Sequence, residues 1–508
     1  MRFSLVRLVN IISLLHGAQS QSFFVSDGNP ILSNGTYYTA DPAPIVVDGV
    51  LYIIAGQDTA PKDENDFTIK NWDLLASKDP NPAGGEWALY SDFVSPHSVF
   101  RWADPDAAYA SQIVRGPDDA FYLYAPVAVA DTKNSDPFGI GVARADRIEG
   151  PYVDHHPEGP IVSQSYPAPG NDIENIDPTV LVDNGRVFMY WGTFGTLLGV
   201  ELHSRNMTSF VGDIVSVTTL NGFFEAPWLM KRGDTYYMLY AANNVGRECT
   251  PTLYHACIAY GTASSPLGPW TYRGVILGIV SSTTSHSGTF HMNDQWYLVY
   301  HTADARGGGH FRRSVAFDKM EFDDSTSPPS IRPIKQTHRP GPPPKPTYER
   351  QQIAVASSSP PCIDRYWIEA IHDQKIPNNP LPPEYWSTYA DEGVIPVQST
   401  VTYSWTTEQR LSGVAMSFYA DHPAGSVEGV APPTEWFVEY KAANGSWVAV
   451  RNSTVYSTRV TTTPKTTKFD PVKTTSLRAT LRAPTNGNDT AGVGIKEWIV
   501  YSTTKAIV

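Results

Sequence analysis

The sequence predicts an all-β protein in which a five-bladed β-propeller is followed by a jelly-roll-type β-sandwich. The 508 residues include 12 % aromatic residues, 42 prolines and 38 glycines, a composition that favours strands and tight turns over long helices. Strand–turn–strand units recur along the first two thirds of the chain, and a proline-rich stretch separates them from a second set of strands. Because one ordinary core does not extend over a chain of this length, two domains are expected.

The first 20 residues, MRFSLVRLVNIISLLHGAQS, predict a signal peptide. Arg2 and Arg7 accompany an apolar run, and Ala18 and Ser20 are the small residues that suit a cleavage site. No later segment has the roughly 18 apolar residues of a transmembrane helix. We therefore expect a secreted, extracellular protein with no membrane partner. Five Asn-x-Ser/Thr sequons agree with secretion, and they begin at Asn34, Asn206, Asn444, Asn452 and Asn488.

Cysteines and charge limit the classes of partner. Cys249 and Cys257 enclose a short loop that is able to close as a disulfide in an oxidising compartment. The third cysteine of the sequence, Cys362, then has no cysteine to pair with. The formal net charge of −13 argues against nucleic acid and anionic membranes as partners and favours a neutral substrate. We expect a monomer.

The domain boundary is predicted at RPGPPPKPTYERQQIAVASSSPPC, residues 339–362. This stretch is proline-rich and then serine-rich, which is typical of an extended linker rather than a helix or a central strand. We place the propeller at residues 21–335, the linker at 336–361 and the C-terminal domain at 362–508. Segments such as TEWFVEYKAANGSWVAV and GIKEWIVYS predict an antiparallel sandwich there, which resembles the discoidin or galactose-binding-like class. Such a sandwich either binds carbohydrate or supports the propeller.

Five hairpins in the larger part share one register, and they start 48 to 70 residues apart. In each hairpin a polar residue precedes an aromatic residue of the second strand by eleven positions. The five pairs are Asp41 and Tyr52, Ser111 and Tyr122, Asp177 and Phe188, Glu225 and Tyr236, and His286 and Tyr297. Repeated hairpins of this kind predict a five-bladed propeller, and a β-sandwich with unrelated hairpins is the alternative.

In a propeller the first strand of each blade lines the central channel, so equivalent positions converge on the axis. Here that position carries three acids, a serine and a histidine, where mere packing would favour apolar residues. Glycoside hydrolysis needs such a set. One carboxylic acid protonates the departing oxygen, a second carboxylate activates water or attacks directly, and a third negative charge raises the pKa of the acid.

The chain resembles glycoside hydrolase family 43 over about residues 35–335. The resemblance rests on ADPAP, NIDPTVLVDNGRVFMYWG, FFEAPWLMKRGDTYYMLYA, SSPLGPW and HSGTFHMNDQWYLVYH, in this order. It implies that Asp41 is the general base, Asp177 the pKa modulator and Glu225 the general acid of an inverting reaction that needs no cofactor. It also implies that His286 helps to hold a water-coordinated ion, often calcium. The family usually has His-Gly-Ser there, whereas this chain has His-Ser-Gly.

Other substrate-binding residues are expected from the same resemblance. Arg313 fits the arginine that the family sends into the pocket, with Arg312 as the alternative. Trp72 and Trp102 fall where family members place aromatic platforms for sugars, and a core position is the alternative for each. His301 is expected to be a hydrogen-bonded structural residue.

The predicted function is release of arabinose or xylose units from plant cell-wall polysaccharides. An exo-acting α-L-arabinofuranosidase is the first expectation and a β-xylosidase the second. Endo-arabinanase, another exo-glycosidase of this fold and a non-catalytic carbohydrate-binding propeller are the alternatives. Retaining fructosidase-type propellers are disfavoured, because their Asn-Asp-Pro-Asn-Gly stretch is missing.

Overall fold

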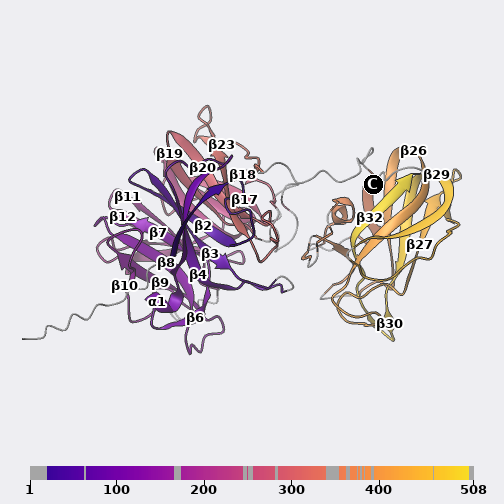
Figure 1. The fold of residues 1–508 in the computed structure, drawn as a ribbon, viewed down its shortest axis with the longest axis horizontal. Coiled ribbons are helices and arrows are strands. Elements are labelled where there is room, and N and C mark those ends of the chain that lie inside the picture. The colour runs from indigo at the N-terminus through magenta and orange to yellow at the C-terminus, as the bar shows by residue number, and fades with distance from the viewer. Residues whose placement is uncertain are drawn as a thin grey trace, which may run out of the picture.

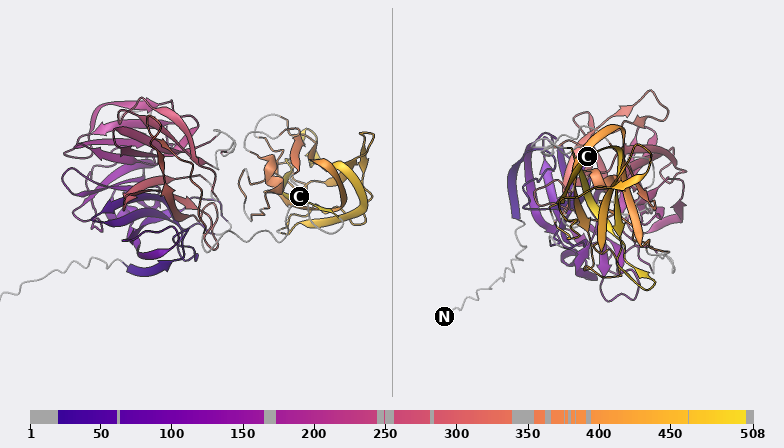
Figure 2. Two further views of the ribbon diagram at one scale, coloured as in Figure 1. Left: turned by 90° about the horizontal axis from the view of Figure 1, so that it is seen from above. Right: turned by 90° about the vertical axis from the view of Figure 1, so that its right-hand side faces the viewer.

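The computed structural model describes residues 20–338, with gaps at 62–63, 165–172, 244–248, 250–255 and 281–283. It also describes residues 354–502, with gaps at 362–365, 375, 378–379, 383, 391–393 and 462. In these ranges the chain is almost entirely β and forms two bodies, the first drawn from indigo to salmon and the second from orange to yellow (Figures 1 and 2). The predicted signal peptide up to residue 19 and Cys362 lie outside the described residues. Within the described ranges, no helix has the length and apolar character needed to cross a membrane.

The N-terminal body consists of five antiparallel sheets, which confirms the predicted five-bladed propeller. Blade one has the order β1 (Ser20–Ser26), β5 (Gly85–Val94), β4 (Ile69–Ser77), β3 (Val50–Asp58), β2 (Thr39–Val47). Blade two has the order β10 (Val153–Asp154), β9 (Phe138–Ala145), β8 (Phe121–Val129), β6 (Ala103–Ala108), with β7 (Gln112–Arg115) also on β8. Blade three has the order β11 (Thr179–Asp183), β12 (Arg186–Trp191), β13 (Leu197–Leu202), β14 (Phe210–Val217).

Blade four has the order β15 (Phe223–Arg232), β16 (Thr235–Ala242), β17 (Cys257–Ala263), β18 (Thr271–Leu277). Blade five has three strands, β19 (Ser287–Met292), β20 (Gln295–Thr302) and β21 (Ser314–Met320). The short helix α1 (Pro96–Val99) joins blades one and two, and the small hairpin of β22 (Phe322–Asp323) and β23 (Ser330–Ile331) follows blade five.

The five predicted hairpins are present, one in each blade, as the antiparallel pairs β2–β3, β7–β8, β11–β12, β15–β16 and β19–β20. Their tight turns follow from residues that adopt positive φ. Asp48 and Gly49 have φ values of 49° and 76°, and Asn184 and Gly185 have 50° and 75°. Positive φ at both central residues is the requirement of the two-residue turn that matches strand twist, so these Asp-Gly and Asn-Gly pairs fix the hairpin register.

The ring closes where the start of the propeller meets blade five. Residues 29–33 run along the edge strand β21. The Asn29 amide donates to the Phe317 carbonyl (2.7 Å) and accepts from its N–H (3.1 Å), and the Ile31 N–H donates to the Val315 carbonyl (2.8 Å). On the inner side, a Cβ on Gly288 would lie 2.3 Å from Cδ of Pro44 in β2. Glycine at this position therefore lets blade five approach blade one closely.

The C-terminal body curls one sheet of seven strands around its own apolar core, which contains Trp386, Tyr403 and Trp498. The order is β25 (Trp386–Ser387), β32 (Gly494–Ser502), β26 (Gln398–Tyr419), β29 (Lys465–Arg482), β27 (Glu435–Lys441), β28 (Trp447–Ala449), and β24 (Val355–Ser359) also pairs with β26. The 3-10 helix η1 (Ile368–His372) and the hairpin of β30 (Thr485–Asn486) and β31 (Asp489–Thr490) complete it.

The predicted linker at 336–361 is wrong at its C-terminal end. Residues 355–359 are strand β24, and Val355 to Ser359 pair in antiparallel register with Ser404 to Thr400 of β26. The serine-rich composition indicated a linker, but the backbone of this segment is paired with a sheet, and Ala356 is buried in the C-terminal core. The second body therefore begins before residue 362.

Candidate active site

A cavity of about 300 Å³ opens where the inner strands of the propeller converge. Asp41, Asp177 and Glu225 all line it, together with His286 and Arg313. They come from blades one, three, four and five, as the common register of the hairpins predicted. The other lining residues are Phe67, Tyr109, Glu174, Ile176, Phe194, Phe224 and Thr284.

Unusual backbone geometry places these side chains. Asp41 and Asp177 have φ values of 53° and 56°, and Ala226 and Thr284, which adjoin Glu225 and Ser285, have 54° and 51°. The strand register also shifts between Ala40 and Ala43 and around Glu225, so the inner strands bulge at these points. Positive φ in residues other than glycine costs free energy and clusters at functional sites. Four blades thus have a strained residue within two positions of the site residue that their hairpin register marks.

Asp41 is paired with the buried guanidinium of Arg313. Arg313 Nη1 and Nη2 donate to Oδ1 and Oδ2 of Asp41 at 2.9 and 3.3 Å. Burial alone would raise the pKa of Asp41, but Arg313 outweighs it, with smaller contributions from His301 and His286, and the pKa lies well below its ordinary value. Asp41 is therefore ionised across the physiological pH range.

Asp58 holds the other side of the same arginine. Nε and Nη2 of Arg313 donate to Oδ2 and Oδ1 of Asp58 at 2.9 and 3.0 Å, and the Arg313 backbone N–H donates to Oδ2 at 2.8 Å. Two carboxylates thus fix the plane of the guanidinium from both edges. The Phe67 ring lies 4.9 Å from the guanidinium carbon and covers its face.

Glu225 and Asp177 have the opposite electrostatic character. Burial raises the pKa of Glu225 against a hydrogen bond from Thr193, and with the negative charges of Asp41 and Glu174 the pKa reaches about 8. The Thr193 hydroxyl donates to Oε2 of Glu225 at 2.9 Å. Burial also raises the pKa of Asp177 well above its ordinary value, with added repulsion from Glu225 and Asp41. Asp177 Oδ2 accepts the Ala226 N–H at 3.0 Å, so it braces the backbone beside Glu225.

The two histidines near Asp41 are neutral. Burial lowers the pKa of His286 to about 4, although the nearby Asp41 carboxylate raises it. His301 Nδ1 accepts the Asp41 backbone N–H at 3.1 Å, which agrees with a structural role. It also lies 3.3 Å from Oδ1 of Asp41. A nitrogen that accepts the N–H has no proton for the carboxylate, so the ring carries its proton on Nε2.

The donor set of the channel does not resemble a calcium cage. Calcium takes six to eight oxygen ligands, and within the described ranges no three His, Cys, Asp or Glu residues gather in a group that could hold a metal. In the same ranges, His301 Nε2, Ser111 Oγ and Ser287 Oγ are buried beside the inner strands without a hydrogen-bond partner. Buried polar atoms of this kind ordinarily bind ordered water.

Two predicted sugar platforms are wrong. Trp72 is completely buried in β4, where its Nε1 donates to the Tyr109 carbonyl at 2.8 Å, so no sugar reaches its ring. Trp102 packs against Phe100 at 5.2 Å and donates to Oδ2 of Asp154 at 3.0 Å, away from the cavity. Arg313 rather than Arg312 enters the cavity, since Arg312 donates to backbone carbonyls at the surface.

Several residues that line the cavity or hydrogen-bond to its charged side chains were missed from the sequence. Asp58, Thr193, Glu174 and Phe194 are not at the repeated hairpin position, so the register did not mark them. The turn Gly-Thr-Phe-Gly at residues 192–195 was a usable signal, because two glycines enclose a hydroxyl and an aromatic ring directly after a buried strand.

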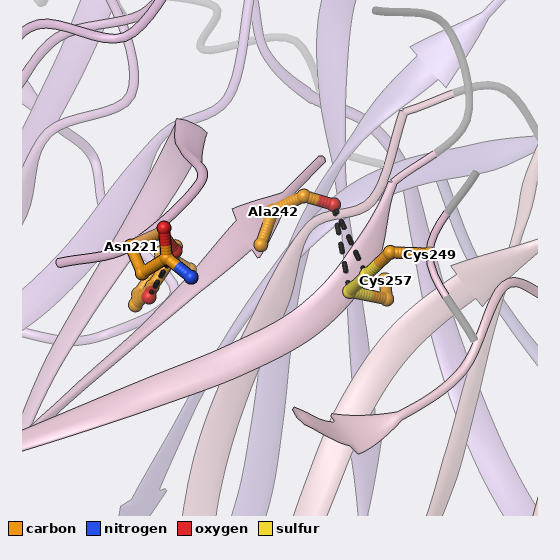
Figure 3. Close-up of a disulfide and its surroundings, with 5 residues drawn as sticks. Asn221, Ala242, Cys249 and Cys257 are labelled. Atoms are coloured by element: carbon orange, nitrogen blue, oxygen red, sulfur yellow. Dashed lines mark hydrogen bonds between the residues drawn. A yellow bond between two sulfur atoms is a disulfide. The ribbon is translucent and has the colours of Figure 1, made fainter. Parts of the chain in front are cut away.

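Cys249 and Cys257 form a disulfide in blade four (Figure 3). Their sulfur atoms lie 3.6 and 3.4 Å from the Ala242 carbonyl oxygen at the end of β16. The asparagines of four predicted sequons are exposed, while Asn206 is half-buried and donates to Ser209 Oγ at 2.7 Å. The four exposed asparagines are Asn34, Asn444, Asn452 and Asn488.

A permanently ionised carboxylate and a protonated carboxyl group thus face one sugar-sized cavity on the axis of a five-bladed propeller. This combination is the one that a glycoside hydrolase requires, because cleavage of a glycosidic bond needs one carboxyl group of each kind. The model of glycosyl hydrolases family 43 matches residues 28–327, more than half of the chain, and the chain belongs to this family.

Several known proteins are similar to the N-terminal part of this chain. A xylosidase/arabinosidase of Bacteroides ovatus is 27 % identical over 333 residues, which cover 56 % of this chain and 92 % of that protein. A β-D-galactofuranosidase of Aspergillus niger is 31 % identical over 198 residues, 37 % of this chain and 54 % of that protein. The crystal structure of a GH43_1 enzyme from Xanthomonas citri has a TM-score of 0.50 and 25 % identity, covering 63 % of this chain and 97 % of that one.

Proposed function

We propose that this glycoside hydrolase releases terminal α-L-arabinofuranosyl or β-D-xylosyl units from plant cell-wall polysaccharides, with inversion at the anomeric carbon. The observation that carries the proposal is the opposite state of two carboxyl groups in one cavity. Arg313 keeps Asp41 ionised, whereas burial keeps Glu225 protonated at neutral pH. Related proteins named for xylosidase and arabinosidase activity support the choice of sugar.

The proposed reaction is a single displacement. Asp41 accepts a proton from a water molecule as the water oxygen forms a bond to the anomeric carbon. At the same time the bond from that carbon to the glycosidic oxygen breaks, and Glu225 gives its proton to the departing oxygen. Asp177 takes no proton in this scheme. Its carboxyl oxygen accepts the Ala226 N–H and so positions the backbone next to Glu225.

The size of the cavity favours exo action. About 300 Å³ is at the lower end of ligand pockets, so the cavity suits one bound sugar unit with its neighbour at the mouth. A long cleft open at both ends would instead favour endo-arabinanase action.

The test combines substrate range, stereochemistry and one variant. Aryl and methyl pentosides, arabinoxylan, arabinan and galactan are supplied as substrates, and proton NMR follows the first-formed anomer. We expect pentose release with inverted configuration. Glu225→Gln should lower kcat/KM by about 10²–10⁴-fold, whereas Glu201→Gln, which changes an exposed ion pair with Arg186, should not. A retained configuration, or full activity of Glu225→Gln, would refute the mechanism, and release of hexose only would refute the choice of sugar.

Secretion and glycosylation belong to the same proposal. The N-terminal apolar segment, four exposed sequons and a disulfide support an extracellular protein. The monomeric state stays a prediction. The calcium ion expected at His286 stays a prediction, and no step of the proposed reaction uses it.

A further inference from the structure

The loop between β12 and β13 is built to hold an aromatic ring at the mouth of the cavity. Phe194 has a φ of 48° and is 66 % exposed, although it lines the cavity. Gly192 and Gly195 enclose it with φ values of 131° and 85°, and a Cβ on Gly192 would lie 2.2 Å from the Thr196 carbonyl oxygen. The backbone can make this turn only with glycine at residue 192, and the turn leaves the Phe194 side chain outside the core.

The same loop is fastened to the segments that carry Asp177 and Glu225. The Gly192 N–H donates to the Ile176 carbonyl at 3.0 Å, directly before Asp177. The Gly195 N–H donates to the Phe224 carbonyl at 3.1 Å, directly before Glu225. Thr193, next to Phe194, donates its hydroxyl to the Glu225 carboxyl group. The position of the ring is therefore fixed relative to the proposed acid.

The chemistry of the acid says which part of a substrate lies beside this ring. Glu225 protonates the glycosidic oxygen, so the sugar that departs with that oxygen must lie next to Glu225 on the outer side of the cavity. Phe194 and the buried Phe224 form a T-shaped pair with ring centroids 5.6 Å apart, and most of the Phe194 side chain remains exposed. Within the described ranges, Phe194 is the one exposed aromatic residue among those that line the cavity.

We propose that Phe194 is a specificity-determining residue that binds the leaving group, by packing against the apolar C–H face of the sugar to which the terminal pentose is attached. The inference rests on the proposed function and deepens it. It assigns the mouth of the cavity to a second pyranose or furanose ring. The positive φ of Phe194 is a strained conformation at the cavity mouth, and strain of this kind clusters at ligand-binding and active sites.

The test compares two substrates that differ only beyond the glycosidic oxygen. One is the methyl glycoside of the released pentose, which has no second ring, and the other is a disaccharide with the same pentose as its terminal unit. Both need the same acid and base. Loss of one aromatic packing surface corresponds to about three- to tenfold in kcat/KM, so Phe194→Ala should lose this factor on the disaccharide and nothing on the methyl glycoside.

Two further variants make the result decisive. Phe194→Tyr keeps the ring face and should restore activity on the disaccharide to within twofold. Phe23→Ala removes another exposed phenylalanine, in β1 of blade one, and should leave kcat/KM unchanged on both substrates. Equal losses on both substrates, or no loss on the disaccharide, would overturn the inference. Failure of the wild-type protein to hydrolyse either pentoside would instead overturn the proposed function, so the two failures are distinguishable.

Discussion

Replacing Arg313 by leucine should lower the stability of the fold at neutral pH and the activity at low pH. The guanidinium donates four hydrogen bonds to two carboxylates. The side chains of Arg313, Asp41 and Asp58 are only 3 %, 10 % and 1 % exposed. Removing one partner of a buried ion pair costs about 3–5 kcal/mol, because the remaining charge has no counterion. We therefore expect the free energy of unfolding to fall by about this amount, which urea denaturation at pH 7 measures.

The pH dependence follows from Asp41. In the wild-type protein its pKa is depressed on folding, so its contribution to stability is present above the unfolded pKa and is lost as pH falls through the folded one. Without Arg313, burial dominates and raises the pKa of Asp41 instead. The stability difference between wild type and Arg313→Leu should therefore shrink as pH falls and the carboxyl groups become protonated. The acid limb of kcat/KM should move to higher pH, because the proposed base is protonated there.

Arg312 is the matched control, since it is the adjacent arginine and, among the described residues, its side chain donates to the neutral carbonyls of Gly307 and Pro61. Arg312→Leu should cost about 1–2 kcal/mol for two neutral acceptors and leave the acid limb in place. Arg313→Lys keeps the charge but cannot bridge both carboxylates, so it should fall between wild type and leucine. Equal stability of the two leucine variants, or an unchanged acid limb in Arg313→Leu, would contradict this account.

Three other outcomes are expected. Glu174→Gln removes a negative charge that raises the pKa of Glu225, so the alkaline limb of kcat/KM should move to lower pH with the acid limb unchanged; a static alkaline limb would show that Glu174 does not act on the acid. Cys257→Ser opens a loop with a sequence separation of 8 and should lower the free energy of unfolding by about 2–3 kcal/mol, and reductant should have the same effect on wild type but none on the variant. Gly288→Ala places a methyl group against Pro44 and should lower the free energy of unfolding by about 1–3 kcal/mol, as measured by urea denaturation. An unchanged free energy would show that blade five can move away from blade one.

The fold was predictable because its repeat is local. Each hairpin has its own turn residues, and a residue eleven positions before an aromatic marks the same place in every blade. The positions of Asp41, Asp177 and Glu225 follow from this register. The Asp58–Arg313 pair does not, because it joins residues 255 positions apart whose contact exists only after the ring has closed.

Aromatic residues were the weakest basis for prediction. Trp72 and Phe194 both follow polar or small neighbours in the sequence, yet one is completely buried and the other is exposed beside the cavity. The difference arises from the backbone: Trp72 lies inside a central strand of blade one, whereas Phe194 lies in a left-handed turn between glycines. Composition misled in the same way at β24, where serine-rich residues pair with a sheet.

The junction that closes the ring also completes the cavity. Arg313 of blade five meets Asp41 and Asp58 of blade one across it, next to the contacts of residues 29–33 with β21. Asp177 belongs to blade three and Glu225 to blade four, away from this junction. Separation of blade one from blade five would remove Arg313 from Asp41, the proposed base. Glu225, the proposed acid, would keep its place in blade four. Enzymatic activity therefore reports whether blades one and five are in contact. A chain that has lost this contact should be inactive even though most of its β-sheets remain folded.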